Sequence, residues 1–564
     1  MRFDIDRFPF SRRGAYLSIT GSPKGDRLIL RNCRRLFGEE QFMDVFFTDE
    51  TGNVLPFRTE ANPSELKIEA GTGSAFFAIG VKEEIHVRAH ALHVLLIPRK
   101  SWNFVVSDDT WRNHVITDHN YTTDTVVLEG SISGRTTTEL VDGYHKQTYA
   151  EYRITPSSSG RLAFSIQVSP DEVVYRPSKV DYEDSVRESE ADWREFLSTC
   201  PVVPDCYIDT AELLWYNLWS SVVAANGNFK YDAILMSKAG MCAVWSWDHC
   251  FNALAMMLGG HRKSALEQFF LLFEMQSPEG KLPDFINTEI HWRAAVKPPI
   301  HGWCFGILMD QMEISTEELE KAYHHLSDWT DWHFKYRDTD GDGIPEYIMG
   351  NDSGWDNSTL FDLGTNMETP DLPAYLYLQM KTLERIATRL GKANLALEWN
   401  IRANTLMETF LSHSYVDGVF VARKSRIHEF EPDPTSLLAC MPIVCGDHLP
   451  AEISKKLVDR IETRFMTPHG LATECPSSTK YLSAGYWRGP VWAPTTLLAV
   501  DGLMRAGYRE LALRVAGNFC DTVAASGAYE NFDALTGDGL CDMGYTWTSS
   551  AALVLMTLLK KEIE

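Results

Sequence analysis

The sequence predicts a multidomain protein in which an N-terminal β-sandwich is followed by an (α/α)6 barrel. Three observations support this prediction. The chain has 564 residues, which is too long for one ordinary hydrophobic core. Short alternating segments occupy residues 1–180. Segments with helical spacing recur over residues 205–564. We therefore expect an accessory β-domain, a connecting segment over residues 181–204 and a helical toroid.

The β-sandwich prediction depends on alternation. In RLAFSIQVS, the residues Leu162, Phe164 and Ile166 alternate with smaller or polar residues, which is typical of a strand with one buried face. VLLIPRK and TVVLEGSISG are further candidate strands. Many short strands between turn signals favour two packed sheets.

The connecting segment is strongly charged. Its core, SKVDYEDSVRESEADWREF, mixes acidic and basic residues at high density, which is typical of a solvated helix. Docking of this helix on the following domain is the alternative. We favour a solvated connecting helix within residues 181–204.

The toroid prediction depends on twelve helical segments. The first contains Leu214, Leu218 and Val222 at helical spacing. The others lie near residues 247–258, 261–276, 302–313, 316–335, 370–391, 393–412, 434–444, 449–463, 490–507, 509–526 and 547–561. Short and long loops alternate between them, and the long loops hold the unusual sequences. Six helix pairs with such loops at one end describe an (α/α)6 toroid.

The composition narrows the classes of partner. A formal net charge of −24 argues against nucleic acids and anionic membranes, since both attract basic proteins. No segment approaches the roughly 18 continuous apolar residues of a membrane span. The eleven cysteines are scattered, and the N-terminus lacks the apolar core of a signal peptide, so we expect reduced thiols and a cytoplasmic location. A homodimer is left open.

The segment GNDSGWDNS contains the first carboxylate with chemical character, Asp356. It follows Trp355, and Asp352 lies just before. The negative charge of one aspartate raises the pKa of the other, and burial beside Trp355 would raise it further. A general acid at neutral pH requires such a raised pKa. The alternative is a polar loop whose side chains only cap turns.

A second carboxylate, Glu530, lies between Tyr529 and Asn531 in AYENFDALTGDG. Two carboxylates that face each other across a sugar-sized pocket can break a glycosidic bond, because one protonates the leaving oxygen while the other activates water or attacks carbon. The alternative for Glu530 is a structural carboxylate that accepts hydrogen bonds from backbone amides.

Aromatic residues surround one cation in GYWRGPVW, where Tyr486, Trp487 and Trp492 accompany Arg488. Flat aromatic faces suit sugar rings, and arginine suits a substrate carboxylate. An aromatic core at the start of a helix is the alternative.

The segment WSWDH places Trp247 and Asp248 just before an apolar helix. Asp248 is either an acceptor for sugar hydroxyls or the N-cap of that helix. We expect the next residue, His249, to be structural.

The segment DTDGDGIPEY spaces its acids like a calcium-binding loop. The four carboxylates are those of Asp338, Asp340, Asp342 and Glu346. An EF-hand needs glutamate at the position where Met349 stands, so this is not an EF-hand. A Ca²⁺ site completed by other loops and a turn stabilised by aspartates are both open.

Four segments in this order, WSWDH, DGDGIPEY with GNDSGWDNS, GYWRGPVW and YENFDALTGDG, resemble glycoside hydrolase family 63. They also resemble the bacterial mannosylglycerate and glucosylglycerate hydrolases and, more distantly, the trehalases of family 37. The likeness covers residues 205–564. It implies an (α/α)6 domain that hydrolyses an α-linked sugar with inversion, and some members of the family hold Ca²⁺.

The resemblance also implies roles for individual residues. It places the general acid on Asp356 and the general base on Glu530. Gln276 stands where relatives have a glutamine that helps to position substrate or water. The residues expected to bind substrate are Trp247, Asp248, Gln276, Trp355, Asn357, Tyr486, Trp487, Arg488 and Trp492.

The choice of substrate is open because residues 359–361 depart from the Pro or Arg of many relatives. Glu429, Glu431 and Asp433 also offer carboxylates that compete with Glu530 for the role of base. We expect hydrolysis of a small α-glucoside or α-mannoside, such as a disaccharide or a glycosylglycerate, with no cofactor required. The rivals are another (α/α)6 enzyme (a phosphorylase, a lyase or an α-L-rhamnosidase-like hydrolase) and a non-catalytic sugar-binding protein.

Overall fold

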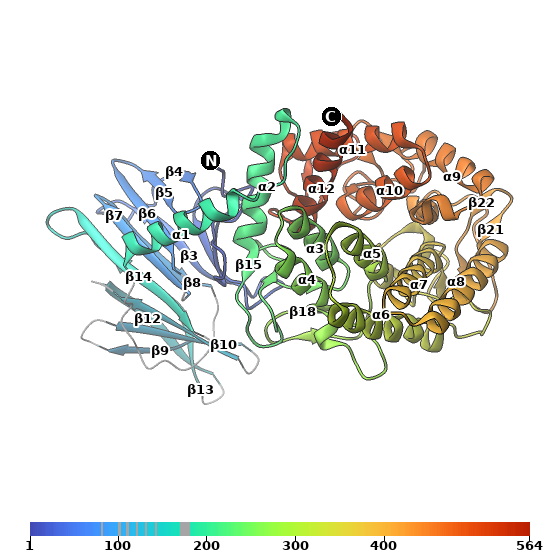
Figure 1. Ribbon diagram of the computed structural model, residues 1–564. Coiled ribbons are helices and arrows are strands. Elements are labelled where there is room, and N and C mark those ends of the chain that lie inside the picture. Colours follow the sequence, from blue (N-terminus) through green and yellow to red (C-terminus); the bar gives the residue numbers. More distant parts are fainter. Residues whose placement is uncertain are drawn as a thin grey trace.

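The computed structural model describes residues 1–80, 83–99, 103–108, 112–119, 122–129, 132–141, 144–169 and 181–563. Figure 1 shows two parts, a pair of β-sheets in the N-terminal region and a ring of helices in the rest of the chain. The helices α1 (Tyr182–Leu197) and α2 (Ile208–Ser221) lie where the two parts meet. The predicted fold class is confirmed, whereas the predicted boundary at residue 180 lies outside the described residues.

Two antiparallel sheets form the N-terminal part. The first has the strand order β1 (Leu17–Gly21), β2 (Leu28–Asn32), β3 (Gln41–Thr48), β8 (His93–Pro98), β13 (Tyr144–Ile154) and β12 (Ile132–Val141). The second has the order β4 (Phe57–Ala61), β5 (Leu66–Ala70), β6 (Gly73–Ile79), β7 (Glu84–His90), β14 (Arg161–Ser169), β11 (Thr122–Glu129), β10 (Arg112–His119) and β9 (Asn103–Asp108).

Alternation along the strands builds the core between these sheets. Phe47 of β3 packs edge-on against Phe57 and Phe77 of the other sheet, with ring centroids 5.3 and 6.3 Å apart. The strand predicted from RLAFSIQVS is β14, and its residues Leu162 and Phe164 are buried as expected.

Twelve helices form two concentric rings in the described part of the chain. The inner ring consists of α3 (Asp248–Leu258), α5 (His301–Gln311), α7 (Asp371–Arg389), η5 (Leu437–His448), α10 (Ala493–Arg505) and α12 (Thr546–Ile563). The outer ring consists of α2, α4 (Arg262–Phe270), α6 (Thr316–Tyr336), α8 (Ala393–Ser414), α9 (Ala451–Arg464) and α11 (Arg509–Ser526). Each inner helix contacts the next, and α12 closes the ring on α3. This arrangement is the predicted (α/α)6 toroid.

Local sequence explains most of these helices. In α6, Ser315 and Glu318 form a capping box, and apolar residues such as Leu319, Leu326 and Trp329 line its buried face. The inner helix η5 differs, because it is a 3-10 helix that contains a proline and is buried along nearly its whole length. A wholly buried helix has no polar face, so its sequence lacks amphipathic periodicity.

The connecting helix α1 corrects one prediction. Its residues Trp193 and Phe196 are buried, and the Trp193 ring packs edge-on against Tyr216 and Trp219 of α2. The helix is therefore docked along one face rather than solvated on all sides, because these aromatic residues outweigh the surrounding charge.

Short strands stand between the helices. Those at the pocket described below are β17 (Val244–Trp245), β18 (Phe285–Ile286), β19 (His291–Trp292), β26 (Val491–Trp492), β27 (Asn531–Phe532) and β28 (Gly539–Leu540). The others are β15 (Val222–Val223), β16 (Ala233–Ile234), β20 (Met367–Glu368), β21 (Tyr415–Val416), β22 (Val419–Phe420), β23 (Arg423–Lys424), β24 (Met466–Thr467) and β25 (Gly470–Leu471). Within the described ranges, every helix is too short or too polar to cross a bilayer.

Candidate active site

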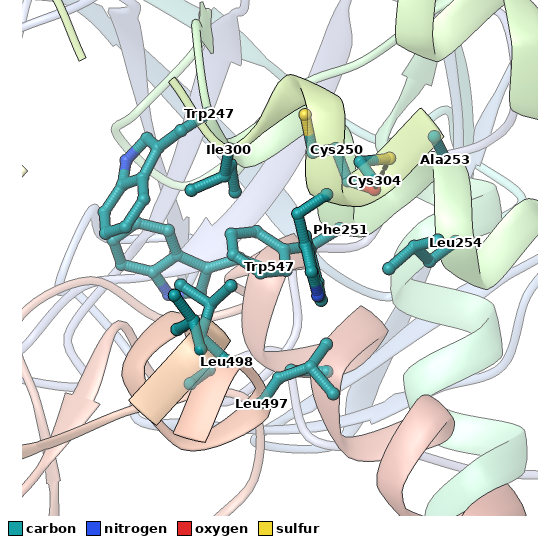
Figure 2. Packing of buried hydrophobic residues seen from close by; sticks show 14 of the residues in the cluster. Trp247, Cys250, Phe251, Ala253, Leu254, Ile300, Cys304, Leu497, Leu498 and Trp547 are labelled. Atoms are coloured by element: carbon teal, nitrogen blue, oxygen red, sulfur yellow. Dashed lines mark hydrogen bonds between the residues drawn. The ribbon is translucent and has the colours of Figure 1, made fainter. Parts of the chain in front are cut away.

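A cavity of about 350 Å³ lies at the ends where the inner helices begin. Its lining comes from the starts of α3 and α12, the hairpins β17–β19, the loop before α5 and the segments around Asp356 and Tyr486. Beneath it, buried apolar side chains fill the ring. Figure 2 shows Trp247 and Trp547, which line the cavity, with Phe251, Ile300 and Leu498 packed beside them.

Strand pairing brings two of the predicted segments together. The residues Trp492 of β26 and Asn531 of β27 are partners in an antiparallel pair. Tyr486 and Glu530 therefore meet although they are far apart in the sequence. The Tyr486 hydroxyl donates a hydrogen bond to Glu530 Oε1 over 3.0 Å.

Glu530 is a buried carboxylate with a perturbed pKa. Burial raises the pKa of Glu530 to about 7, although the hydrogen bond from Tyr486 lowers it, and the nearby charge of Asp356 adds to the rise. In the described structure Glu530 does not itself line the cavity but contacts Tyr486, which does. A carboxylate that titrates near neutral pH is suited to accept a proton.

Asp356 lies in the cavity wall after a tight turn. The short helix η3 (Gly350–Ser353) ends at Gly354, whose left-handed φ of 71° reverses the chain. The Asp356 side chain is about one-third exposed (37%), and its Oδ1 lies 3.6 Å from the ammonium group of Lys297. Asp352, by contrast, binds Arg337 and backbone amides and is structural.

Lys297 is a buried cation that the sequence did not single out. Its ammonium donates to the carbonyl and side-chain oxygens of Asn351, at 2.8 and 2.6 Å. It also lies 3.5 Å from Asp284. Burial alone lowers the pKa of Lys297, but the carboxylates of Asp356 and Asp284 raise it above its usual value. Lys297 is therefore charged and joins two acidic side chains at the cavity.

Two more buried carboxylates face the cavity. Asp248 begins α3, does not cap it with its side chain, and has an oxygen without a hydrogen-bond partner among the described residues. Asp284 Oδ1 also accepts no hydrogen bond within the described structure, although it lies 3.5 Å from the Lys297 ammonium. Burial raises the pKa of both carboxyls, most strongly that of Asp248. Buried oxygens without partners are costly, and sugar hydroxyls are suitable donors for them.

Aromatic rings form much of the wall. Trp247, Trp487 and Trp547 line the cavity together with Tyr545. The Trp487 ring lies flat on Trp492, with centroids 3.8 Å apart and an interplanar angle of 8°. Trp487 is therefore held in the wall as a packed ring that is 1% exposed.

Several predicted substrate-binding residues support the wall from behind. Trp355 and Trp492 pack against Trp487. Asn357 accepts a hydrogen bond from the Trp487 amide, and Arg488 binds the Asn357 carbonyl. Arg488 also pairs with Asp362 at 2.6 Å, which turns its charge away from the cavity. The structure thus brings these residues to the site as supports rather than as lining.

Gln276 lies apart from the cavity lining in the described structure. Its amide nitrogen donates to the carbonyls of Gly280 and His325, and its oxygen contacts the His325 ring. The carboxylates that compete with Glu530 for the role of base do not line the cavity either, since Glu429, Glu431 and Asp433 are absent from its described lining. Glu431 is paired with Lys480.

The four acids of the predicted calcium loop do not share one centre in the part that the structure describes. Asp338 and Glu346 accept hydrogen bonds from donors near them in the chain. Ligand oxygens of Asp340 and Asp342 lie instead within 4.8 Å of those of Glu368 and a histidine nitrogen. Imidazole among carboxylates suits a transition metal better than calcium, which prefers oxygen. Calcium at this loop stays a prediction.

Two of the cavity residues that sequence reasoning missed had a weak signal in the sequence. Tyr545 and Trp547 stand before and at the start of α12, as Trp245 and Trp247 stand before α3. This repeated spacing of aromatics at inner helix starts was visible in the sequence. Lys297 lies in an ordinary loop and carried no such signal.

Comparison with known proteins agrees with this geometry. The family model of the mannosylglycerate hydrolase MGH1-like glycoside hydrolase domain matches residues 242–548, more than half of the chain. Mannosylglycerate hydrolase MGH1 of Selaginella moellendorffii is 23% identical over 394 residues, which cover 56% of this chain and 80% of that protein.

Two solved structures share the fold. A GH63 mannosylglycerate hydrolase from Thermus thermophilus, in complex with Tris and D-glycerate, has a TM-score of 0.52 at 17% identity and covers 61% of this chain and 98% of its own. A bacterial glucoamylase complexed with acarbose has a TM-score of 0.66 at 11% identity and covers 98% and 94%. The chain therefore belongs to the mannosylglycerate hydrolase MGH1-like family of glycoside hydrolases.

Proposed function

We propose that this protein hydrolyses a small α-linked glucoside or mannoside with inversion at the anomeric carbon, with Asp356 as general acid and Glu530 as general base. The observation that carries the proposal is an unlike pair of carboxylates, Asp356 in the cavity wall and Glu530 bonded to the lining residue Tyr486. Asp356 is partly exposed beside Lys297, whereas Glu530 is buried with a pKa of about 7. Environments this different support separate roles for the two carboxyl groups. A raised pKa alone would favour Glu530 as the acid, so the assignment of acid to Asp356 and base to Glu530 rests on their positions in the family's motifs.

The proposed reaction transfers two protons and replaces the glycosidic bond at the anomeric carbon with a bond to the oxygen of water. The carboxyl of Asp356 donates its proton to the glycosidic oxygen as the bond from that oxygen to the anomeric carbon breaks. Glu530 accepts a proton from the water that attacks this carbon from the opposite face. Lys297 stabilises the negative charge that Asp356 acquires, since its ammonium lies 3.6 Å from Oδ1.

Substrate binding is assigned to the groups around this pair. The unpartnered oxygen of Asp248 and the Asp284 oxygen beside Lys297 accept hydrogen bonds from sugar hydroxyls. Trp247 and Trp487, both buried in the wall, bound the space for the sugar ring. These steps need only side chains and water. A cytoplasmic location and a homodimer also stay predictions.

The test follows the anomer of the product. Wild type, Asp356→Asn and Glu530→Gln are incubated with α-linked disaccharides and glycosylglycerates, and proton NMR records the first anomer released. We expect the β-anomer from wild type and a loss of kcat of about 10²–10⁴-fold in each variant, the range for one general acid or base. Substrate binding by Asp356→Asn, measured by calorimetry, should persist.

Other outcomes would identify the rivals. Initial release of the α-anomer would mean retention and remove the water-activating role of Glu530. Turnover that requires inorganic phosphate would indicate a phosphorylase, and products that absorb in the ultraviolet would indicate a lyase. Binding without any turnover by wild type would leave a sugar-binding protein.

A further inference from the structure

An aromatic side chain of the N-terminal domain reaches the cavity. Phe37 follows strand β2, is 66% exposed, and lines the cavity beside residues of the barrel. Its φ is 57°, a left-handed conformation that costs energy for a bulky residue. Single exposed apolar residues are common, but a strained, exposed phenylalanine at the opening of a cavity calls for a reason.

Two barrel residues extend this aromatic surface. Trp292 of the β18–β19 hairpin is 49% exposed and also lines the cavity. Its ring is parallel to Phe285, with centroids 6.3 Å apart and an interplanar angle of 6°. Phe37 meets the same Phe285 ring edge-on at 6.0 Å. The aromatic opening, defined as Phe37, Phe285 and Trp292, therefore spans the two domains.

The position of Phe37 is fixed by polar contacts of the two residues Arg34 and Arg35, which precede it in the chain. The neighbouring Arg35 pairs with Glu289 of the barrel hairpin. The side-chain amide of Asn287 donates to the Arg34 carbonyl at 3.2 Å. These bonds hold the Phe37 segment against the hairpin before any ligand arrives, which lowers the entropic cost of binding.

The cavity has a buried inner end and an exposed opening. Asp248, which has an unpartnered oxygen, and Asp284 are buried, whereas Phe37 and Trp292 are exposed. A sugar held by the two aspartates therefore lies at the inner end. Asp356, partly exposed in the wall, would then meet the glycosidic oxygen between the ends. The aromatic opening is left for the leaving group.

The charge of the cavity favours a neutral leaving group. Its charged lining consists of Asp248, Asp284, Asp356 and Lys297. Lys297 is the one cation among the described lining residues, and it already lies 3.5–3.6 Å from Asp284 and Asp356. A carboxylate on the leaving group would therefore find no unpaired cation among the described lining residues to bind it.

We propose that the aromatic opening is a leaving-group subsite for an uncharged sugar ring, so that the substrate is an α-linked disaccharide or short oligosaccharide rather than a glycosylated acid. This inference rests on the proposed hydrolysis. It gives the N-terminal domain a direct part in specificity through Phe37. The family match begins at residue 242, so this part is additional to the matched domain.

The test compares two leaving groups on the same sugar. An α-disaccharide places a ring at the opening, whereas the α-glycosyl fluoride places only a fluoride ion there. We expect Phe37→Ala to lower the ratio of kcat/KM for the disaccharide to kcat/KM for the fluoride about tenfold, mainly through KM, as the loss of one stacking contact predicts. Trp292→Ala should act likewise, and Phe37→Tyr should keep the wild-type ratio.

The control and the contradictory outcomes separate the two proposals. Val54→Ala removes another exposed apolar side chain of the same domain, outside the cavity lining, and should leave the ratio unchanged. An unchanged ratio in Phe37→Ala with an active wild type would overturn this inference alone. So would a higher kcat/KM for the glycosylglycerate than for the disaccharide. A wild type inactive on the fluoride and on every glycoside would remove the proposed hydrolysis and this inference together.

Discussion

At the scale of single residues, the bond between Tyr486 and Glu530 sets the pH dependence of the proposed reaction. Glu530 must be ionised to accept a proton, and its pKa is raised to about 7 by burial. We therefore expect the acid-side limb of the kcat/KM profile, which the ionisation of Glu530 sets, to rise about tenfold per unit below pH 7. Tyr486→Phe removes a donor that favours the ionised form, so the pKa rises further and the curve moves to higher pH.

A pH profile of kcat/KM for wild type and Tyr486→Phe checks this expectation. Tyr529→Phe is the matched control, because Tyr529 is adjacent to Glu530 in sequence and its hydroxyl has no bond to the carboxylate in the described structure. Superimposed profiles for wild type and Tyr486→Phe would show that Glu530 is not the group that titrates.

Sequence reasoning located the residues that lie in compact motifs. Trp247, Asp248 and Asp356 were identified because their segments combine aromatics with acids, and the structure brings them to one cavity. Lys297 and Asp284 were missed because each is isolated in its own segment. Only the tertiary fold places them beside Asp356.

At the scale of elements, the turn after η3 places Asp356 through a glycine. Gly354 has a φ of 71°, and a Cβ added there would lie 2.8 Å from the Trp247 ring. Gly354→Ala should therefore lose about 1–2 kcal/mol of stability through strain and also displace Trp247, which lowers kcat/KM. Thermal unfolding and kinetics with the α-disaccharide measure the two effects.

Gly341→Ala is the matched control for this turn. Gly341 has a similar φ of 77°, but a Cβ there would meet no atom within 4 Å. Gly341→Ala should therefore lose about as much stability as Gly354→Ala but keep the wild-type kcat/KM. Equal kcat/KM values in the two variants would show that Trp247 does not depend on the close packing of Gly354.

The sequence predicted the positions of the helices better than their geometry and packing. Amphipathic spacing is a local property, so α6 and α9 begin within a few residues of their predicted starts. The 3-10 geometry of η5 was not foreseen, because a buried apolar run carries no periodicity. The docking of α1 was missed for a related reason, since Trp193 and Phe196 are few among many charges.

At the scale of the whole molecule, the two domains share a core and a buried cation. One continuous cluster of buried residues contains Tyr16 and Leu36 of the N-terminal part together with the barrel aromatics. Lys238 of the barrel is buried beside them, and burial lowers its pKa to about 8. Its ammonium donates to Ser11 Oγ and to the carbonyl of Ala15, at 3.1 and 2.5 Å. The domains are thus joined by both apolar and polar contacts.

This joint predicts that the two domains unfold together. We expect one calorimetric transition for wild type, because neither domain can separate without exposing the shared core. Lys238→Met leaves the Ala15 carbonyl without a buried donor, at a cost of about 1–3 kcal/mol, and should lower Tm. Lys455→Met, at an exposed position of α9, should change it little. Two resolved transitions in wild type would contradict the joint. They would also weaken the case for Phe37 as part of the barrel's cavity, since a domain that opens independently does not hold that ring in place.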